Sequence, residues 1–108
     1  MLKGIGGMTN LLKQAQKVQA EMARLQEELK DRVVEGTSGG GMVTAMVNGH
    51  QEVVAVKIDP EVARGEEVEM LEDLVVAAVN QAMKKSRELL QEEMKKITGG
   101  LNIPGLFP

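Results

Sequence analysis

Two groups of basic residues in this chain could hold an anionic polymer. Lys13, Lys17 and Arg24 follow one another at intervals of four and seven residues, so on a helix they stay on one side. The second group lies near the other end of the chain and consists of Lys84, Lys85, Arg87, Lys95 and Lys96. Cations spaced along a helix can neutralise duplex phosphates, which gives an affinity that falls with salt and reads little base sequence.

Catalytic chemistry has little support in the same sequence. His50 is the only histidine, and we expect it on the surface of a hairpin rather than at a catalytic or metal site. Ser38 and Ser86 have no base near them in the sequence, and the glycines at 39–41 lack the Lys-Ser/Thr pair of a phosphate-binding loop. The chain has no Cys, which excludes disulfides and Cys-bound metals. We therefore predict a protein that is not an enzyme and that holds no cofactor and no metal.

The charge is distributed unevenly over the 108 residues, a length that suffices for one small domain. The formal net charge is -3, but residues 59–73 hold seven acidic side chains against Arg64 alone, so the rest of the chain is mildly basic. Phe107 is the only aromatic residue, which disfavours single-stranded nucleic acids because their bases stack on aromatic rings. No apolar run approaches the ~20 residues of a membrane span and no signal peptide opens the chain, so we expect no membrane contact.

A long helix is expected to carry the first basic group. Thr9 or Asn10 can cap its start, and the helix should run to about Asp31. Apolar positions recur along it at intervals of three and four residues, which predicts a heptad seam made of Met8, Leu11, Ala15, Val18, Met22, Leu25 and Leu29. We treat residues 1–108 as one domain, with residues 1–8 and 99–108 as flexible ends.

A change to period two after this helix predicts three strands. They should cover residues 32–37, 42–47 and 50–58. Asn48-Gly49 predicts a tight type I′ turn between the last two strands. A two-residue turn at this place would pair Val47 with His50 and Val43 with Val54.

The second basic group is expected on a long helix at the other end of the chain. Asp59-Pro60-Glu61 is typical of a helix start, with a capping carboxylate followed by Pro at the first helical position. After a short opening turn, the long helix should run from about Glu67 to Thr98, where Gly99-Gly100 ends it.

These elements predict an α+β fold in the order α-β-β-β-α, with two long helices flanking a three-stranded antiparallel sheet. Such a sheet is about 14 Å wide, whereas the helices would be about 33 Å and 48 Å long. Both faces of the predicted sheet are largely apolar, and the helices overhang it, so one chain leaves apolar surface uncovered. We therefore predict a homodimer with projecting helical arms. Its interface would include Met42, Met46, Val53 and Ala55.

Two kinds of partner fit this arrangement. In one, the basic residues on the arms hold the phosphates of double-stranded DNA. In the other, the heptad seam and the Met-rich surface bind another protein, since Met adapts well to partner surfaces. The residues alone leave both interpretations open.

The chain resembles the YbaB/EbfC family of bacterial nucleoid-associated proteins over nearly its whole length. The resemblance rests on short segments that keep the family's order and spacing: 10–16, 39–43, 47–49, 58–61, 69–75, 77–82, 98–101 and 104–105. It implies a cytoplasmic, nucleoid-located homodimer that binds double-stranded DNA with low sequence specificity through projecting helices, and that contributes to nucleoid organisation and gene regulation. Genes of recombination and replication often lie nearby in this family, which makes their products candidate partners. Lys13 lies in a matching segment, whereas the other basic residues rest on electrostatics alone.

Overall fold

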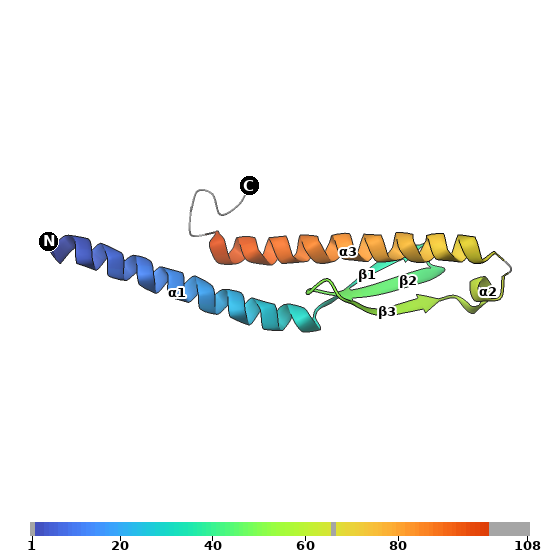
Figure 1. Ribbon diagram of the computed structural model, residues 1–108, viewed down its shortest axis with the longest axis horizontal. Coiled ribbons are helices and arrows are strands. Elements are labelled where there is room, and N and C mark those ends of the chain that lie inside the picture. Colours follow the sequence, from blue (N-terminus) through green and yellow to red (C-terminus); the bar gives the residue numbers. More distant parts are fainter. Residues whose placement is uncertain (1, 66, 100–108) are drawn as a thin grey trace.

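The chain folds into a helix, a three-stranded sheet and a second long helix (Figure 1). The computed structural model describes the backbone of residues 2–65 and 67–99, and side chains from residue 7 onward. The elements are α1 (Leu2–Asp31), β1 (Val33–Ser38), β2 (Val43–Asn48), β3 (Val53–Ile58), α2 (Pro60–Ala63) and α3 (Val68–Thr98). The sheet is antiparallel in the order β1-β2-β3, so the predicted α+β layout is confirmed. The radius of gyration is 20.8 Å, against about 13 Å for a compact domain of this length.

Helix α1 begins earlier than the sequence predicted. It starts at Leu2, so the predicted start at Thr9 or Asn10 is wrong, while the predicted end at Asp31 is confirmed. Glycine disfavours a helix interior, but a helix that already exists can extend by one hydrogen bond per residue without a new nucleus. We call residues 2–24 the arm, because they precede Leu25, the first buried residue among those described. The outer part of the arm projects beyond the end of α3 (Figure 1).

The core lies where α3 crosses β1 and β2. Val43, Ala45 and Val47 of β2 are fully buried, and they pack against Ala78 and Ala82 of α3. Small residues bring the two layers together at Gly36 of β1, where an added Cβ would overlap the backbone of Ala78 and Ala82. The absence of a side chain at this position therefore sets the distance between helix and sheet.

Side chains of α3 also close the outer edge of β1. Lys85 Nζ donates a hydrogen bond to the carbonyl oxygen of Glu35 at 2.9 Å. Gln81 Oε1 accepts one from the backbone amide of Thr37 at 2.6 Å. These bonds occupy backbone groups that an edge strand otherwise leaves unpaired. Strand β3, at the other edge of the sheet, has no such cover from the described residues.

The β2–β3 connection is longer than predicted, and the predicted pairing is wrong. Val43 pairs with Ile58 rather than Val54, and Val47 pairs with Val53 rather than His50. The side-chain carbonyl of Asn48 accepts hydrogen bonds from the backbone amides of His50 and Glu52, which holds open a loop over residues 49–52. A bulge at Met46/Val47 adds a further shift. Away from the bulge, the observed register differs from the predicted register by an even number of residues. Side chains of the paired strands therefore stay on their predicted faces.

Much of the apolar surface of β3 is open in this chain. Val53, Val54, Val56 and Ile58 are exposed by 45%, 52%, 38% and 37%, because α3 packs mainly along β1 and β2. The face of the sheet that points away from α3 carries Met46 and Ala55, which are half-buried. The chain therefore covers one face of its sheet, and that cover stops before β3.

The predicted start of the C-terminal helical region is confirmed. Asp59 caps α2 through a hydrogen bond that its Oδ1 accepts from the amide of Glu61 at 2.9 Å, and Pro60 is the first helical residue. Helix α3 then runs from Val68 to Thr98, within one residue of the predicted bounds.

Replacing Gly36 by Ala should lower the free energy of unfolding by about 3 kcal/mol, because the new methyl group forces α3 away from β1. Urea unfolding followed by circular dichroism measures the change. Gly7→Ala is the matched control: nothing lies within 4 Å of its added Cβ, and Ala favours the helix. An unchanged urea midpoint for Gly36→Ala would contradict this packing.

Candidate nucleic-acid interface

The basic residues of α1 lie along the arm, as the sequence predicted. Lys13, Lys17 and Arg24 are exposed, and by the helix period they lie on the side opposite the apolar seam. Arg24 Nε lies 3.7 Å from Glu28 Oε1, in an exposed pair one turn along the helix. Lys13 and Lys17 form no ion pair with any residue that the structure describes, so both charges are available to a ligand.

The basic residues of α3 are exposed but do not form one stripe. Lys84 and Lys95 are eleven residues apart, close to three turns, and therefore share a line along the helix. Lys85 and Lys96 share a second line, and Arg87 lies on a third. The line through Lys84 and Lys95 is opposite the buried face of α3. Those two cations therefore point away from the sheet.

Two of the α3 cations already have partners in the fold. Lys85 binds the Glu35 carbonyl, as described above. Lys96 Nζ lies 3.1 Å from Glu93 Oε1, and Arg32 Nη1 lies 3.0 Å from the same oxygen. The hydrogen bonds from Lys96 and then Arg32 hold the pKa of Glu93 below its usual value. Glu93 is therefore ionised at neutral pH, and it partly neutralises this end of α3.

A cleft of about 220 Å³ separates α1 from the C-terminal part of α3. Its lining includes Arg24 and Lys96, so the structure brings together one member of each predicted basic group. Three carboxylates line the same cleft, namely Glu21, Glu28 and Glu93. A phosphate placed between the helices would meet more negative than positive charge. The outer faces of the helices are therefore the better phosphate-binding surfaces.

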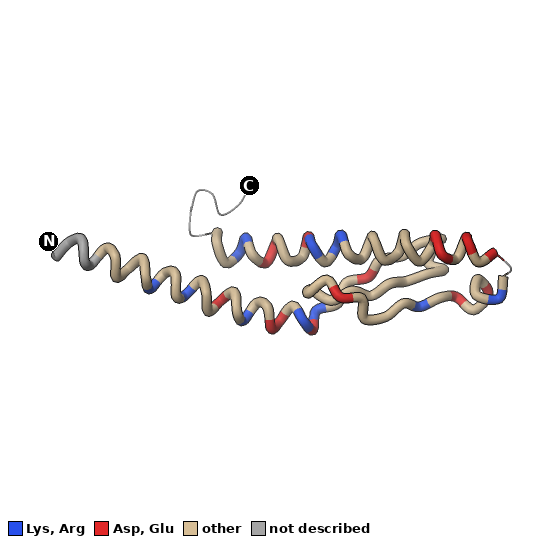
Figure 2. Tube along the Cα trace, in the orientation of Figure 1, with Lys and Arg blue, Asp and Glu red and all other residues tan. Residues whose placement is uncertain are grey.

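One group of acidic residues lies at the end of the molecule away from the arm (Figure 2). We call this region the acidic tip; its exposed members are Asp59, Glu61, Glu67, Glu69, Glu72 and Asp73. Figure 2 shows basic and acidic residues interspersed along α1 and the part of α3 beside it, whereas the charged residues at the start of α3 are all acidic. The acidic stretch that the sequence indicated is therefore also one acidic region in space.

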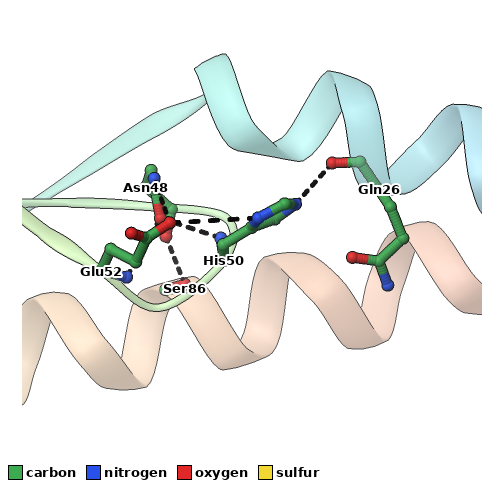
Figure 3. Close-up of polar contacts among 5 residues, drawn as sticks. All are labelled: Gln26, Asn48, His50, Glu52 and Ser86. Atoms are coloured by element: carbon green, nitrogen blue, oxygen red, sulfur yellow. Dashed lines mark hydrogen bonds and ion pairs between the residues drawn. The ribbon is translucent and has the colours of Figure 1, made fainter.

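The sequence did not predict a polar junction between the β2–β3 turn and both long helices (Figure 3). Ser86 Oγ, fully buried, donates a hydrogen bond to the carbonyl oxygen of Asn48 at 2.7 Å. His50 is exposed in the hairpin loop, as the sequence predicted, but its Nε2 also donates to the carbonyl oxygen of Gln26 in α1. These contacts join residues far apart in the chain, so no local spacing could have indicated them.

Other kinds of site find no support in the part of the chain that the structure describes. No group of three His, Asp or Glu side chains there is placed to share a metal ion. None of the described helices combines the length and apolarity that crossing a bilayer requires.

The fold and its charge pattern define an α+β protein with exposed cations on a projecting helix, and no catalytic group is recognisable among the described residues. Residues 4–101 match the model of the YbaB/EbfC DNA-binding family, and the chain belongs to this family. It is 57% identical over 100 residues to nucleoid-associated protein TTE0040 of Caldanaerobacter subterraneus subsp. tengcongensis, covering 93% of this chain and 90% of the relative. It is 51% identical over 102 residues to a nucleoid-associated protein of Pelotomaculum thermopropionicum, covering 94% and 97%.

A solved structure supports the same assignment of fold. The crystal structure of the uncharacterized protein HP0035 from Helicobacter pylori matches with a TM-score of 0.60 and 31% identity, over 68% of this chain and 86% of that one. The family assignment that the sequence segments indicated is therefore confirmed, and this is a nucleoid-associated, DNA-binding family.

Lys85→Ala should lower the free energy of unfolding by about 1 kcal/mol, because it removes a charged donor from the backbone of β1. Lys84→Ala is the matched control, since Lys84 points away from the sheet and its loss should change stability by less than about 0.5 kcal/mol. Urea unfolding compares the two variants. Equal stabilities would contradict a structural role for Lys85.

Proposed function

We propose that this protein binds double-stranded DNA as a homodimer, with low sequence specificity, through the outer faces of its projecting helices. It acts by binding rather than by catalysing a reaction, and it works on the nucleoid in the cytoplasm, where it contributes to DNA organisation and gene regulation. The observation that carries this proposal is the placement of Lys13 and Lys17, which are exposed on a projecting helix and unpaired with any described residue.

The length of the arm suits a duplex. Residues 2–24 span about 35 Å at 1.5 Å per residue, and one helical turn of DNA is about 34–36 Å long. Lysine side chains hold phosphates as point charges, which positions a protein on DNA without reading bases. We assign the main contacts to Lys13, Lys17, Lys84, Arg87 and Lys95. Arg24, Lys85 and Lys96, which have partners within the fold, contribute less.

The proposed homodimer follows from the uncovered part of the sheet. The open edge of β3 and the half-covered face around Met46 and Ala55 leave apolar surface that a second copy would bury. We place Met42, Met46, Val53 and Ala55 in this interface. Met42 and Val53 are exposed by 43% and 45% in the single chain.

Replacing Lys13, Lys17 and Arg24 together by Ala should weaken duplex binding without changing the mass of the dimer. Each phosphate contact contributes about 0.9 to the slope of log affinity against log salt. The triple variant should therefore reduce that slope by up to about 3 units in a duplex titration at several salt concentrations. Lys17→Ala and Arg64→Ala form a matched single-charge pair, because Arg64 lies beside the acidic tip. Only Lys17→Ala should weaken binding.

Retention of the duplex by the triple variant at high salt would contradict the phosphate mechanism. A wild-type protein that binds no duplex at low salt, yet co-purifies with a stoichiometric protein, would favour an adaptor role. Met8 and Leu11 of the heptad seam are exposed by 66% and 67%, and they would then contact that protein. Proteins of recombination or replication would be the first partners to test.

Ala55→Glu should convert the dimer into a monomer of 11.7 kDa, because it places a charge on the apolar sheet face. Sedimentation at micromolar concentration measures the mass. Ala77→Glu is the control, because Ala77 is exposed on the side of α3 that points away from the sheet. A dimer that survives Ala55→Glu, or a monomeric wild-type protein, would contradict the proposed interface.

A further inference from the structure

The turn after β2 lies against the C-terminal end of α1 (Figure 3). The backbone amide of Gly49 donates hydrogen bonds to the carbonyl oxygens of Leu29 at 2.8 Å and Arg32 at 2.9 Å. Carbonyl groups in the last turn of a helix have no partner within it, so the turn supplies a cap from elsewhere in the chain. A Cβ on residue 49 would lie 2.6 Å from both the Cβ and the carbonyl oxygen of Leu29, so this contact requires glycine.

His50 makes a second contact with the same helix. Its Nε2 bonds to the carbonyl oxygen of Gln26. A carbonyl oxygen only accepts, so Nε2 carries the proton. Gln26 precedes Leu29 by three residues, which places the two contacts about one turn apart on one side of α1. On the other side of the imidazole, Glu52 Oε1 lies 4.0 Å from Nδ1.

The turn itself is fixed to α3. The buried Ser86 hydroxyl bonds to the backbone of Asn48, and the Asn48 side chain holds the amides of His50 and Glu52 at 3.0 Å each. Helix α1 therefore reaches α3 through a chain of hydrogen bonds that passes through this turn. Before Val18 every described residue of α1 is exposed, while Val18, Glu21 and Met22 are half-buried, so the outer part of the arm gains its direction from its base.

We propose that residues 48–50 form a clamp on α1, and that His50 is the positioning residue that sets the direction of the arm. The buried side chains of Leu25 and Leu29 and the Gly49 contact hold the base of α1. The contact at Gln26 adds a fixed point about one turn further toward the arm, which limits rotation about that base. The arm extends about 36 Å beyond Gln26, so a rotation of about 10° at the clamp moves its tip by about 6 Å. His50 acts on the arm without touching DNA, and its effect on DNA binding rests on the proposed function.

A distance measurement within one chain tests the clamp directly. Because the sequence has no Cys, spin labels on Gln16→Cys in the arm and Asn80→Cys in α3 meet no background thiol. Dilution of the labelled chain into an excess of unlabelled protein leaves only pairs within one protomer. Double electron–electron resonance should then show that the distribution of distances between the two labels is about twofold wider for His50→Ala than for the unsubstituted chain. His50→Gln should restore the width, since its amide N–H can donate to the same carbonyl.

Gln51→Asn is the matched control in the same turn. Gln51 has φ 61°, which Asn accepts readily, and its side chain is exposed, so the distribution should not change. An unchanged width for His50→Ala would overturn the clamp. Equal widening by Gln51→Asn would overturn the specific role of His50, because the whole turn would then have loosened.

A duplex titration separates this inference from the proposed function. If the arm of His50→Ala holds the binding direction for a fifth of the time, its Kd rises about fivefold. The salt slope should stay the same, because no phosphate contact is removed. A widened distribution with an unchanged Kd would overturn the positioning role. If the unsubstituted protein binds no duplex, the proposed function fails, while the distance measurement still decides whether the clamp exists.

Discussion

The close approach of helix α3 to strand β1 determines how the rest of this chain is arranged. A glycine at position 36 lets the helix backbone at Ala78 and Ala82 come against the strand. At that distance, Gln81 and Lys85 reach the backbone of the β1 edge. Ser86, about one turn after Ala82, reaches the β2–β3 turn. A larger residue at position 36 would therefore disturb the core, the closed sheet edge and the base of the arm together.

The same packing explains why only one face of the sheet is covered by a helix of this chain. Helix α3 is committed to β1 and β2, and α1 leaves the body instead of crossing the other face. The apolar residues of β3 remain open as a result. A chain of this length has too few elements to both cover its sheet and extend an arm. The sheet is therefore left partly uncovered because the residues of α1 that could cover it form the projecting arm.

The elements and their order could be predicted from sequence because periodicity and caps are local. The heptad spacing placed the end of α1 at Asp31, and the Asp59-Pro60 pair placed α2. The predicted pairing of β2 with β3 was wrong because Asn48-Gly49 fits a two-residue turn as well as it fits the longer loop. Only contacts with Ser86 and Leu29 select the longer loop. The predicted start of α1 was wrong because Gly4, Gly6 and Gly7 disfavour a new helix but do not prevent an existing helix from extending through them.

The candidate interface was predictable in composition but not in its pairings. Exposure of the cations followed from their positions on helices. The partner of Lys85, the carbonyl of Glu35, is 50 residues away in sequence, and Arg32 and Glu93 are 61 apart, so only the fold reveals which charges are already engaged. The contact of His50 with Gln26 is of the same kind, because it depends on where the turn meets α1.

The separation of charge along a molecule 77 Å long has a kinetic consequence. A polyanion that approaches the acidic tip is repelled, whereas one that approaches the arm is attracted, so the field of the chain exerts a torque before contact. For a duplex ligand, this torque would align the arm with the DNA during the encounter and raise the fraction of collisions that lead to binding. The acidic tip would thus help to orient the arm toward the DNA.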